Sequence, residues 1–331
     1  SLPGLPALTP DDVIITSGCS GALDAAITVL CNEGDSLLIP RPAFSLYETI
    51  ATSRGINAQH YKLDSTRSWE ADLADMEAAI DGTTRAILVN NPSNPCGSVY
   101  SRAHLTEIIK VAAKHKLPII ADEIYGDLVF SGHEYVPMAS IAAEHKVPVL
   151  TVGGLAKEWL VPGWRIGWVV VYDTSEAVFG GVRAGLVALS QLVLGASVPM
   201  QHAIMAVLTP EEEHKEELAA FNKRTLDELE ANAKFVVERL GGGRIKGLTV
   251  VVPQGAMYVM VGIVEGAFKG VSDDSEFCQR LLDEEGVFVL PGQCFGLAHF
   301  VRFVLCPPID KLTQACDRIA AFCERNYVGS A

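Results

Sequence analysis

Short apolar runs alternate with longer amphipathic segments through the first half of the chain. The runs are rich in Val, Ile and Leu and predict strands, while the apolar residues of the segments between them have helical spacing. Strands that alternate with helices form a mostly parallel sheet with helices on its faces, which is an α/β fold. The predicted strands are Val13–Ile15, Ser36–Ile39, Ala86–Val89, Pro118–Ala121, Val149–Val152 and Ile166–Val171, and the predicted helices are Ser20–Cys31, Ala71–Ile80 and Ala103–His115.

The second half of the chain predicts a smaller α+β domain. Thr209 is followed by Pro210 and three glutamates, a pattern that predicts a helix with its cap, a first-position proline and acids in its first turn. This helix is expected to run through Leu240, where three glycines end it. We therefore place a large domain at 1–235 and a small C-terminal domain at 236–331. The small domain has predicted strands at Leu248–Val252, Met257–Val261 and Val301–Leu305 and predicted helices at Ser275–Glu285 and Ile309–Arg325.

Composition narrows the class of protein. A chain of 331 residues suits one large and one smaller domain. Its net charge of −14 repels phosphate backbones, so nucleic acid is not expected as a partner. The most apolar long stretch, Val182–Met200, is interrupted by polar residues and a proline. That stretch predicts a buried helix, and no membrane span is expected.

The cysteines and the first residues predict a cytoplasmic protein. The eight cysteines occur singly and form no C-x-x-C pair, which indicates reduced thiols in the core. The residues after Ser1 include several prolines and have no pattern of a secretory signal. The cysteines are Cys19, Cys31, Cys96, Cys278, Cys294, Cys306, Cys316 and Cys323.

A lysine and an arginine flank a turn between two of the predicted strands. Lys157 follows small residues, so its amine is open to approach, and Pro162-Gly163 predicts a turn that places Arg165 at the start of the next strand. A nucleophilic amine and a guanidinium fork for phosphate could face one ligand, which would be an aldehyde cofactor with a phosphate group. The alternative is a surface lysine and an arginine that merely begins a strand.

Two further motifs follow strands in the first fifty residues. The loop around Gly18 leads into a predicted helix, and free amides at a helix N-terminus can hold a phosphate. The alternative is an ordinary turn in which Ser20 caps the helix. Phe44 follows another strand within a proline-rich loop, where its ring could stack on a planar cofactor or simply fill the core.

Three polar residues complete the set of candidates. Asn94 lies in a loop of two Asn-Pro pairs, where its amide could donate to an oxyanion, although Asn-Pro is also an ordinary turn dipeptide. Asp122 ends an apolar strand and is either a functional carboxylate or a helix cap. Arg302 lies within an apolar strand and suits a bound carboxylate if buried, or faces water if the strand is an edge.

Taken together, these motifs resemble the fold-type I enzymes that use pyridoxal 5′-phosphate (PLP). The pattern Lys157-x4-Pro162-Gly163-x-Arg165 resembles their cofactor-lysine motif, and the N-P-x-N-P-x-G loop around Asn94 resembles a second signature. The strings at 121–131 and 254–258 are similar to those of tyrosine aminotransferases. The resemblance covers essentially the whole chain and implies a large domain with a mostly parallel sheet plus a smaller α+β domain.

The resemblance also implies a role for each candidate residue. The cofactor phosphate is expected at the helix N-terminus and at Arg165, and the ring is expected to stack on Phe44. Asp122 would pair with the pyridine nitrogen, while Asn94 and Tyr125 would face the phenolic oxygen. Lys157, Asp122 and Tyr125 are the expected catalytic residues, and Asn94 and Arg302 are the expected substrate-binding residues; no metal is expected. The phosphate-binding residues at the helix N-terminus would be Gly18, Cys19 and Ser20.

The implied activity is transamination between an aromatic or broadly accepted L-amino acid and a 2-oxo acid such as 2-oxoglutarate or pyruvate. Lys157 would hold the cofactor covalently and then move a proton at the substrate Cα as general base and acid. A C–S lyase or another α-amino acid enzyme on the same fold is the first alternative, because cofactor motifs do not determine the later steps. A protein that binds PLP without turnover is the second alternative.

Two departures from the family pattern affect these expectations. Gly154 stands where aspartate aminotransferases carry a phosphate-binding serine. In addition, nothing in the chain matches the upstream segment that completes the family's small domain and reaches the neighbouring subunit's phosphate. We therefore expect the N-terminal part of the small domain to be absent and the chain to belong to a longer one. We also expect a homodimer formed through the large domain, with the loops around Ser17, Phe44 and Asn94 near the contact.

Overall fold

A mixed eight-stranded sheet forms the centre of the large domain. The computed structural model describes residues 8–173, 180–192 and 195–329. The strands follow the order β1-β8-β7-β6-β5-β2-β3-β4. The five neighbouring strands β7, β6, β5, β2 and β3 are parallel to one another. Strands β8, β1 and β4 are added by antiparallel pairing. Their bounds are β1 Val13–Ser17, β2 Ser36–Arg41, β3 Asn57–Asp64, β4 Glu70–Ala71, β5 Thr84–Asn90, β6 Ile119–Asp122, β7 Val149–Gly154 and β8 Ile166–Tyr172.

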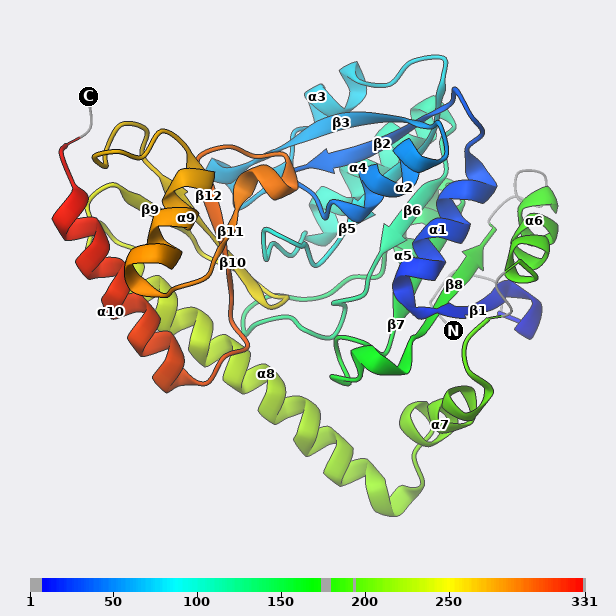
Figure 1. The fold of residues 1–331 in the computed structure, drawn as a ribbon. Helices are drawn as coiled ribbons and strands as arrows, with labels where there is room; N and C mark the ends of the chain where they lie inside the picture. The colour runs from blue at the N-terminus through cyan, green and yellow to red at the C-terminus, as the bar shows by residue number, and fades with distance from the viewer. Residues whose placement is uncertain (1–7, 174–179, 193–194, 330–331) are drawn as a thin grey trace.

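Helices cover both faces of this sheet (Figure 1). Alternate strand residues point to opposite faces, so Leu88 and Ile120 pack with the helices α1, α2 and α6, while Val89 and Ala121 pack with α3, α4 and α5. This arrangement confirms the predicted α/β class. The helices are α1 Gly18–Leu30, α2 Leu46–Ser53, α3 Leu73–Ala78, α4 Arg102–His115, α5 Met138–Ala142 and α6 Gly180–Ser190.

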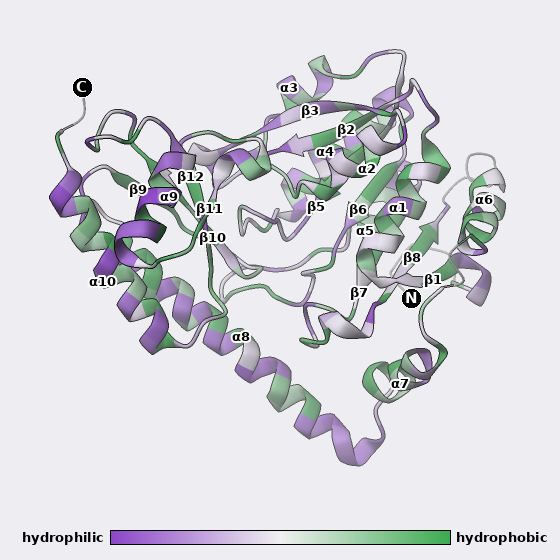
Figure 2. Cartoon of the chain, in the orientation of Figure 1, coloured by the Kyte–Doolittle hydropathy of each residue, from purple (hydrophilic) through white to green (hydrophobic). Residues whose placement is uncertain are grey.

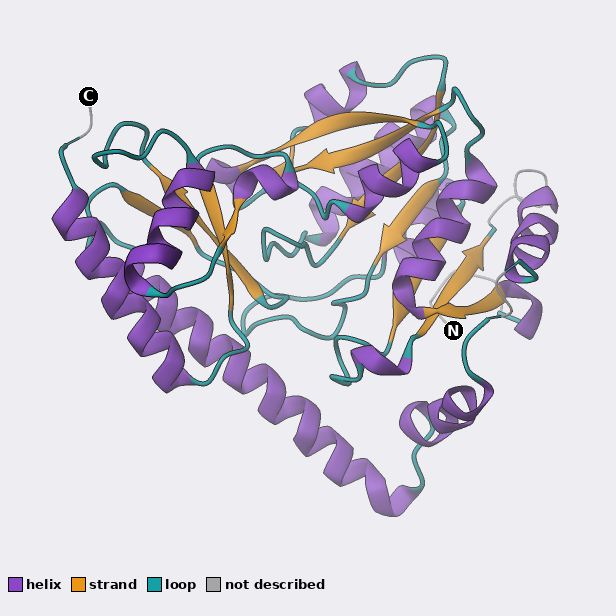
Figure 3. Cartoon of the chain, in the orientation of Figure 1, coloured by secondary structure: helices purple, strands orange, loops and turns teal. Residues whose placement is uncertain are grey.

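The small domain is a second sheet with helices on one side (Figure 3). Its four strands are antiparallel in the order β11-β12-β10-β9. Helices α9 and α10 and the end of α8 pack on this sheet and share one apolar core with it. Helix α7 Val198–Leu208 packs on the large domain. The elements that follow it are α8 Glu212–Leu240, β9 Leu248–Val251, β10 Tyr258–Ile263, α9 Asp274–Glu285, β11 Leu290–Pro291, β12 Phe300–Val304 and α10 Ile309–Asn326. The short 3-10 helices are η1 Pro10–Asp12, η2 Ser65–Arg67, η3 Ala143–His145, η4 Pro162–Trp164 and η5 Gly292–Phe295.

Helix α8 connects the two domains. Its buried residues begin only at Leu229 and continue to Leu240, within the core of the small domain. The first half of the helix is mostly hydrophilic and runs along the outside of the molecule (Figure 2). The division at residue 235 stays a prediction, and α8 runs across it.

Several local predictions are wrong. The helix expected to be capped by Thr209 begins at Glu212, and the Thr209 hydroxyl instead donates to the Met205 carbonyl at the end of α7. The stretch Val182–Met200 is not one buried helix: it contributes to α6 and α7, and its residues at 193–194 lie outside the described residues. Proline at the start of α7 explains this second helix, because proline fits a first turn.

The cysteine prediction is confirmed only in part. All eight cysteines are free, but Cys294 and Cys306 are exposed and Cys19 is only half-buried, so these three are not simply core thiols. No helix among the described residues is long and apolar enough to cross a membrane.

Candidate active site

The predicted residues meet in one cavity between the two domains. Its volume is ≈ 260 Å³. The carboxyl ends of β5, β6 and β7 and the N-terminus of α1 surround it, as expected for ligand sites of such sheets. The lining residues are Cys19, Ser20, Leu23, Phe44, Tyr47, Asn94, Asp122, Ile124, Tyr125, Ala156, Lys157, Pro162, Arg165, Tyr258 and Arg302.

The N-terminus of α1 and Arg165 form an anion-binding end of the cavity. The helix begins at Gly18 with Ser17 as its cap, so the alternative in which Ser20 caps the helix is wrong. Gly18 has φ +69°, and a Cβ at this position would lie 2.3 Å from Arg165 Nη2. Glycine is therefore required for the guanidinium to lie against the helix start. Arg165 Nη2 donates to the Ser17 carbonyl at 3.2 Å, which holds this cation beside the free helix amides.

Asp122 is a buried carboxylate at the end of β6. It is only 2% exposed, and burial raises the pKa of its carboxyl group. The Tyr47 hydroxyl donates to Asp122 Oδ2 at 2.6 Å, and the Ile124 amide donates to Oδ1 at 3.2 Å. No helix begins between Asp122 and Met138, so the helix-cap interpretation is wrong. A carboxylate in this position can stabilise a positive charge inside the cavity.

Tyr47 is a site residue that sequence reasoning missed. It lies in the first turn of α2, three positions after Phe44, and the two rings contact each other edge to face with centroids 5.8 Å apart. Phe44 itself lines the cavity and also packs against the core, so both interpretations of this residue apply. The spacing of the two aromatic residues around the start of a helix was the available signal.

Lys157 follows β7 in a turn and lines the cavity. Its Nζ lies 5.6 Å from the centroid of the Tyr125 ring. The two glycines before it are needed by the sheet, because a Cβ on Gly154 would lie 2.5 Å from the Ile166 carbonyl and a Cβ on Gly153 would contact Trp168 at 2.8 Å. The departure at Gly154 therefore has a steric reason: a serine would collide with the neighbouring strand β8.

Arg302 projects into the cavity from the small domain. Its strand β12 pairs with β10 on one side and β11 on the other, so the edge-strand alternative is wrong. The guanidinium carbon lies 4.3 Å from the Tyr258 ring centroid and 4.6 Å from that of Phe295. Arg302 Nη1 donates to Asn94 Oδ1 at 2.8 Å, whereas its buried Nε has no hydrogen-bond partner among the described residues. Burial lowers the pKa of Arg302, and such a cation favours a bound anion.

Tyr258 connects Arg302 to Tyr125. The Tyr125 and Tyr258 hydroxyls are 2.9 Å apart, and burial raises the pKa of Tyr125. Tyr258 and Phe295 were both missed as site residues, although Tyr258 ends one of the strings that resembled the family. Their contacts with Arg302 depend on the pairing of β10 with β12 and on the loop before β12, neither of which is visible in the sequence.

The loop of Asn94 is organised by a neighbouring amide. Asn90 Oδ1 accepts from the Asn94 amide at 2.7 Å, and Asn90 Nδ2 donates to the Asp122 carbonyl at 3.1 Å. The loop is thereby tied to the end of β6. Asn94 contacts Arg302 across the domain boundary, so its side chain is oriented by the small domain.

The groups around the cavity fit PLP. This cofactor needs donors for its phosphate, an acid near its ring nitrogen, a hydrogen bond at its phenolic oxygen and an amine for its aldehyde. The Gly18 backbone leaves no room for a side chain beside Arg165, and the buried Asp122 carboxylate has no cation within hydrogen-bonding distance among the described residues. These observations define the class of protein as a fold-type I PLP enzyme.

The comparisons with known proteins identify the family. Residues 4–319 match the family model of aminotransferase class I and II. Tyrosine aminotransferases from Dictyostelium discoideum and Homo sapiens are each 46% identical to the chain, over 96% and 97% of its length and 75% and 68% of their own. The crystal structure of tyrosine aminotransferase from Leishmania infantum has a TM-score of 0.89 and 39% identity, covering 97% of this chain and 76% of that one. The chain belongs to the class I and II aminotransferases and is a PLP-dependent enzyme.

Proposed function

We propose that this enzyme transfers the amino group of L-tyrosine or another aromatic amino acid to a 2-oxo acid such as 2-oxoglutarate or pyruvate. The observation that carries the proposal is the position of Arg302, a half-buried cation that lines the same cavity as Lys157. Arginine binds a carboxylate with two parallel hydrogen bonds, and every amino acid and 2-oxo acid has such a group. Similarity to relatives named tyrosine aminotransferase supports the aromatic side chain.

The residues around the cavity divide the reaction between them. Arg302 holds the α-carboxylate and so presents the Cα–H bond to Lys157, whose amine moves the proton as base and then as acid. Asp122 would stabilise a positive charge at the ring nitrogen of PLP, and Asn94 and Tyr125 would donate to its phenolic oxygen. PLP, when bound, supplies an electron sink for the Cα bond that breaks. The anchoring of its phosphate falls to Arg165 and to the Gly18, Cys19 and Ser20 amides.

The substrate proposal predicts a strong preference for aromatic donors. We expect kcat/KM for L-tyrosine to exceed that for L-aspartate by ~30-fold, because burying an aromatic side chain contributes ~2 kcal/mol or more. Formation of 4-hydroxyphenylpyruvate with 2-oxoglutarate measures this directly. Release of a thiol and pyruvate from cysteine conjugates without any 4-hydroxyphenylpyruvate would indicate a C–S lyase. An unchanged cofactor spectrum with every amino acid would indicate a protein that binds PLP without turnover.

We also propose that the enzyme is a cytoplasmic homodimer. The free state of all eight cysteines supports a reducing compartment.

Helix α7 packs one side on the cluster around Leu155 and Ile166 but exposes apolar residues on its other side, including Met205 at 64%. Leu160, three residues after Lys157, is 50% exposed. An apolar patch that adjoins the site favours a second copy of the chain as its partner.

The dimer proposal predicts that one charge in this patch separates the subunits. We expect light scattering to give the mass of a dimer for the wild-type protein and of a monomer for Met205→Glu at the same micromolar concentration. Val252→Glu is the matched control, because Val252 is 61% exposed but lies beyond β9 in the small domain. A monomeric wild-type protein with full activity would contradict the proposal, and so would equal dissociation by both variants.

A further inference from the structure

The geometry of the small domain assigns a positioning role to Asp274, a buried carboxylate outside the cavity. We propose that Asp274 fixes the loop 292–299, which in turn holds Arg302 in the orientation that binds a substrate carboxylate. This inference rests on the proposed role of Arg302. Asp274 does not line the cavity, so it acts through the loop and not by contact with substrate.

Asp274 is the acceptor for three N–H groups of one loop. It is 0% exposed and occupies the first position of α9. Its Oδ2 accepts from the Gln293 amide at 2.9 Å, and its Oδ1 accepts from Gln293 Nε2 at 3.0 Å and from the His299 amide at 2.9 Å. One carboxylate thus joins both ends of the loop. A buried ion remains in the interior only with such a set of partners.

The loop has a conformation that needs this support. His299 has φ +60°, a left-handed backbone that residues other than glycine rarely adopt. Gly292 lies so close to the other side of the loop that a Cβ would be 2.3 Å from the Leu297 carbonyl. The Asp274 bond to the His299 amide stabilises the strained residue just before β12. Arg302 lies three positions further along that strand.

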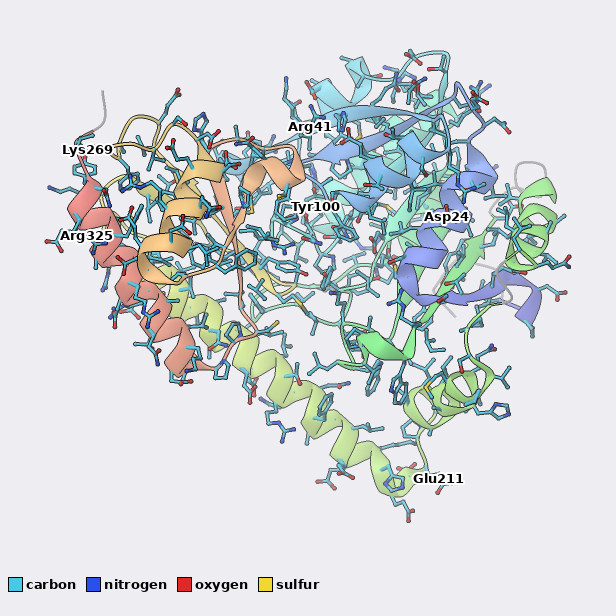
Figure 4. All side chains as sticks on the ribbon, viewed as in Figure 1. Asp24, Arg41, Tyr100, Glu211, Lys269 and Arg325 are labelled. Atoms are coloured by element: carbon cyan, nitrogen blue, oxygen red, sulfur yellow. The ribbon has the colours of Figure 1, made fainter. Side chains whose placement is uncertain are left out.

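The supported loop contacts Arg302 and the large domain at the same time. The Phe295 ring lies 4.6 Å from the Arg302 guanidinium carbon, and Asn94 accepts a hydrogen bond from the same guanidinium. The Phe295 carbonyl accepts from the Ala43 amide at 3.0 Å, next to Phe44. Arg41, labelled in Figure 4 between the two domains, lies against Gly296. A shift of the loop would therefore release one face of Arg302 and a contact between domains.

Asparagine cannot replace Asp274 without cost. The amide offers one acceptor oxygen and one NH2 group, whereas the loop presents donors to both carboxylate oxygens. In Asp274→Asn, an NH2 group must face an N–H group, so one buried donor loses its partner. The substitution keeps the size of the side chain but removes its negative charge and one of the two acceptor oxygens that the loop uses.

The test uses ligands that differ in their carboxylate. We expect Asp274→Asn to weaken binding of 3-(4-hydroxyphenyl)propionate to the holoenzyme by ~10-fold and to raise KM for L-tyrosine similarly, with kcat changed less than ~3-fold. Tyramine has no carboxylate, so the rate at which it converts the bound cofactor should be unchanged. Arg302→Leu should weaken the carboxylate ligand by ~30-fold or more.

A neighbouring carboxylate provides the control. Asp273 caps α9 by accepting from the Glu276 amide at 2.8 Å, and among the described residues it reaches the loop through the Gln293 side chain and not through a backbone amide. Asp273→Ala should lower the melting temperature without changing affinity for the carboxylate ligand. An effect of Arg302→Leu together with no effect of Asp274→Asn would overturn the inference and leave the proposed function intact. Equal losses for the carboxylate ligand and for tyramine would reduce Asp274 to a general structural residue.

Discussion

Lys157→Ala is expected to lower transamination by ~10⁴-fold or more. An acid–base residue alone contributes ~10²–10⁴-fold, and Lys157 is also the amine that we propose binds the cofactor aldehyde. Borohydride treatment followed by mass spectrometry should find the cofactor on the peptide of Lys157 in the wild-type protein and on no peptide of the variant. The same variant should still bind PLP, because Ser20, Arg165 and Asp122, which we propose hold its phosphate and ring, remain in the cavity.

Lys110→Ala is the control for this variant. Lys110 is exposed on α4, pairs with Glu107 and does not line the cavity. Its removal should change neither turnover nor the labelled peptide. Near wild-type turnover of Lys157→Ala would end the assignment of this lysine, and label on a different lysine would transfer the role to that residue.

Asp122→Asn is expected to lower kcat by ~10³-fold. Without the carboxylate, the pKa of the cofactor's ring nitrogen should fall, and each unit of that fall corresponds to ~1.4 kcal/mol. Burial raises the pKa of Asp122, so its folded form binds protons more tightly than its unfolded form. Stability therefore falls as pH rises from the unfolded-state pKa to the raised folded-state pKa of this carboxyl group. We expect the cofactor-free variant to be at least as stable as the wild-type protein at pH 7.

Tyr47→Phe helps to distinguish the effect of Asp122 on kcat from its effect on stability. This substitution removes the 2.6 Å hydrogen bond to Asp122 and keeps the ring that contacts Phe44. We expect a smaller loss of kcat, ~10-fold, because one hydrogen bond to a charged group contributes ~1.5–3 kcal/mol. Thermal denaturation and steady-state kinetics of both variants decide the matter. A large loss of stability in Asp122→Asn with unchanged kcat would mean that Asp122 is structural.

The elements that the sequence predicted well are those with a local pattern. The apolar runs at β5, β6 and β7 have the length of buried strands, and the polar residues that end the first two, Asn90 and Asp122, mark the carboxyl edge of the sheet. The strand β3 and the helices α2 and α5 were missed. Strand β3 carries polar residues such as Gln59, His60 and Lys62 near the margin of the sheet, so its pattern resembles a loop.

The apolar stretch before α8 shows the limit of hydropathy. The stretch Val182–Met200 was predicted as one buried helix, but Val187, Leu192 and Val198 within it are exposed. Apolar content measures the tendency to leave water, and it does not specify whether the partner is the same chain. Only the packed structure distinguishes a core helix from a surface helix with an apolar outer side.

The sequence by itself determined the α/β class, the cofactor-lysine motif and the chemical identity of the groups in the site, because these depend on residue type and short spacing. The tertiary structure decided which groups touch. Tyr47 meets Asp122, and Arg302 meets Asn94 across 208 positions. Asp274 supports Arg302 through a loop of left-handed backbone. Such contacts depend on strand order and domain packing, which arise from many weak interactions distant in sequence, so no local pattern encodes them.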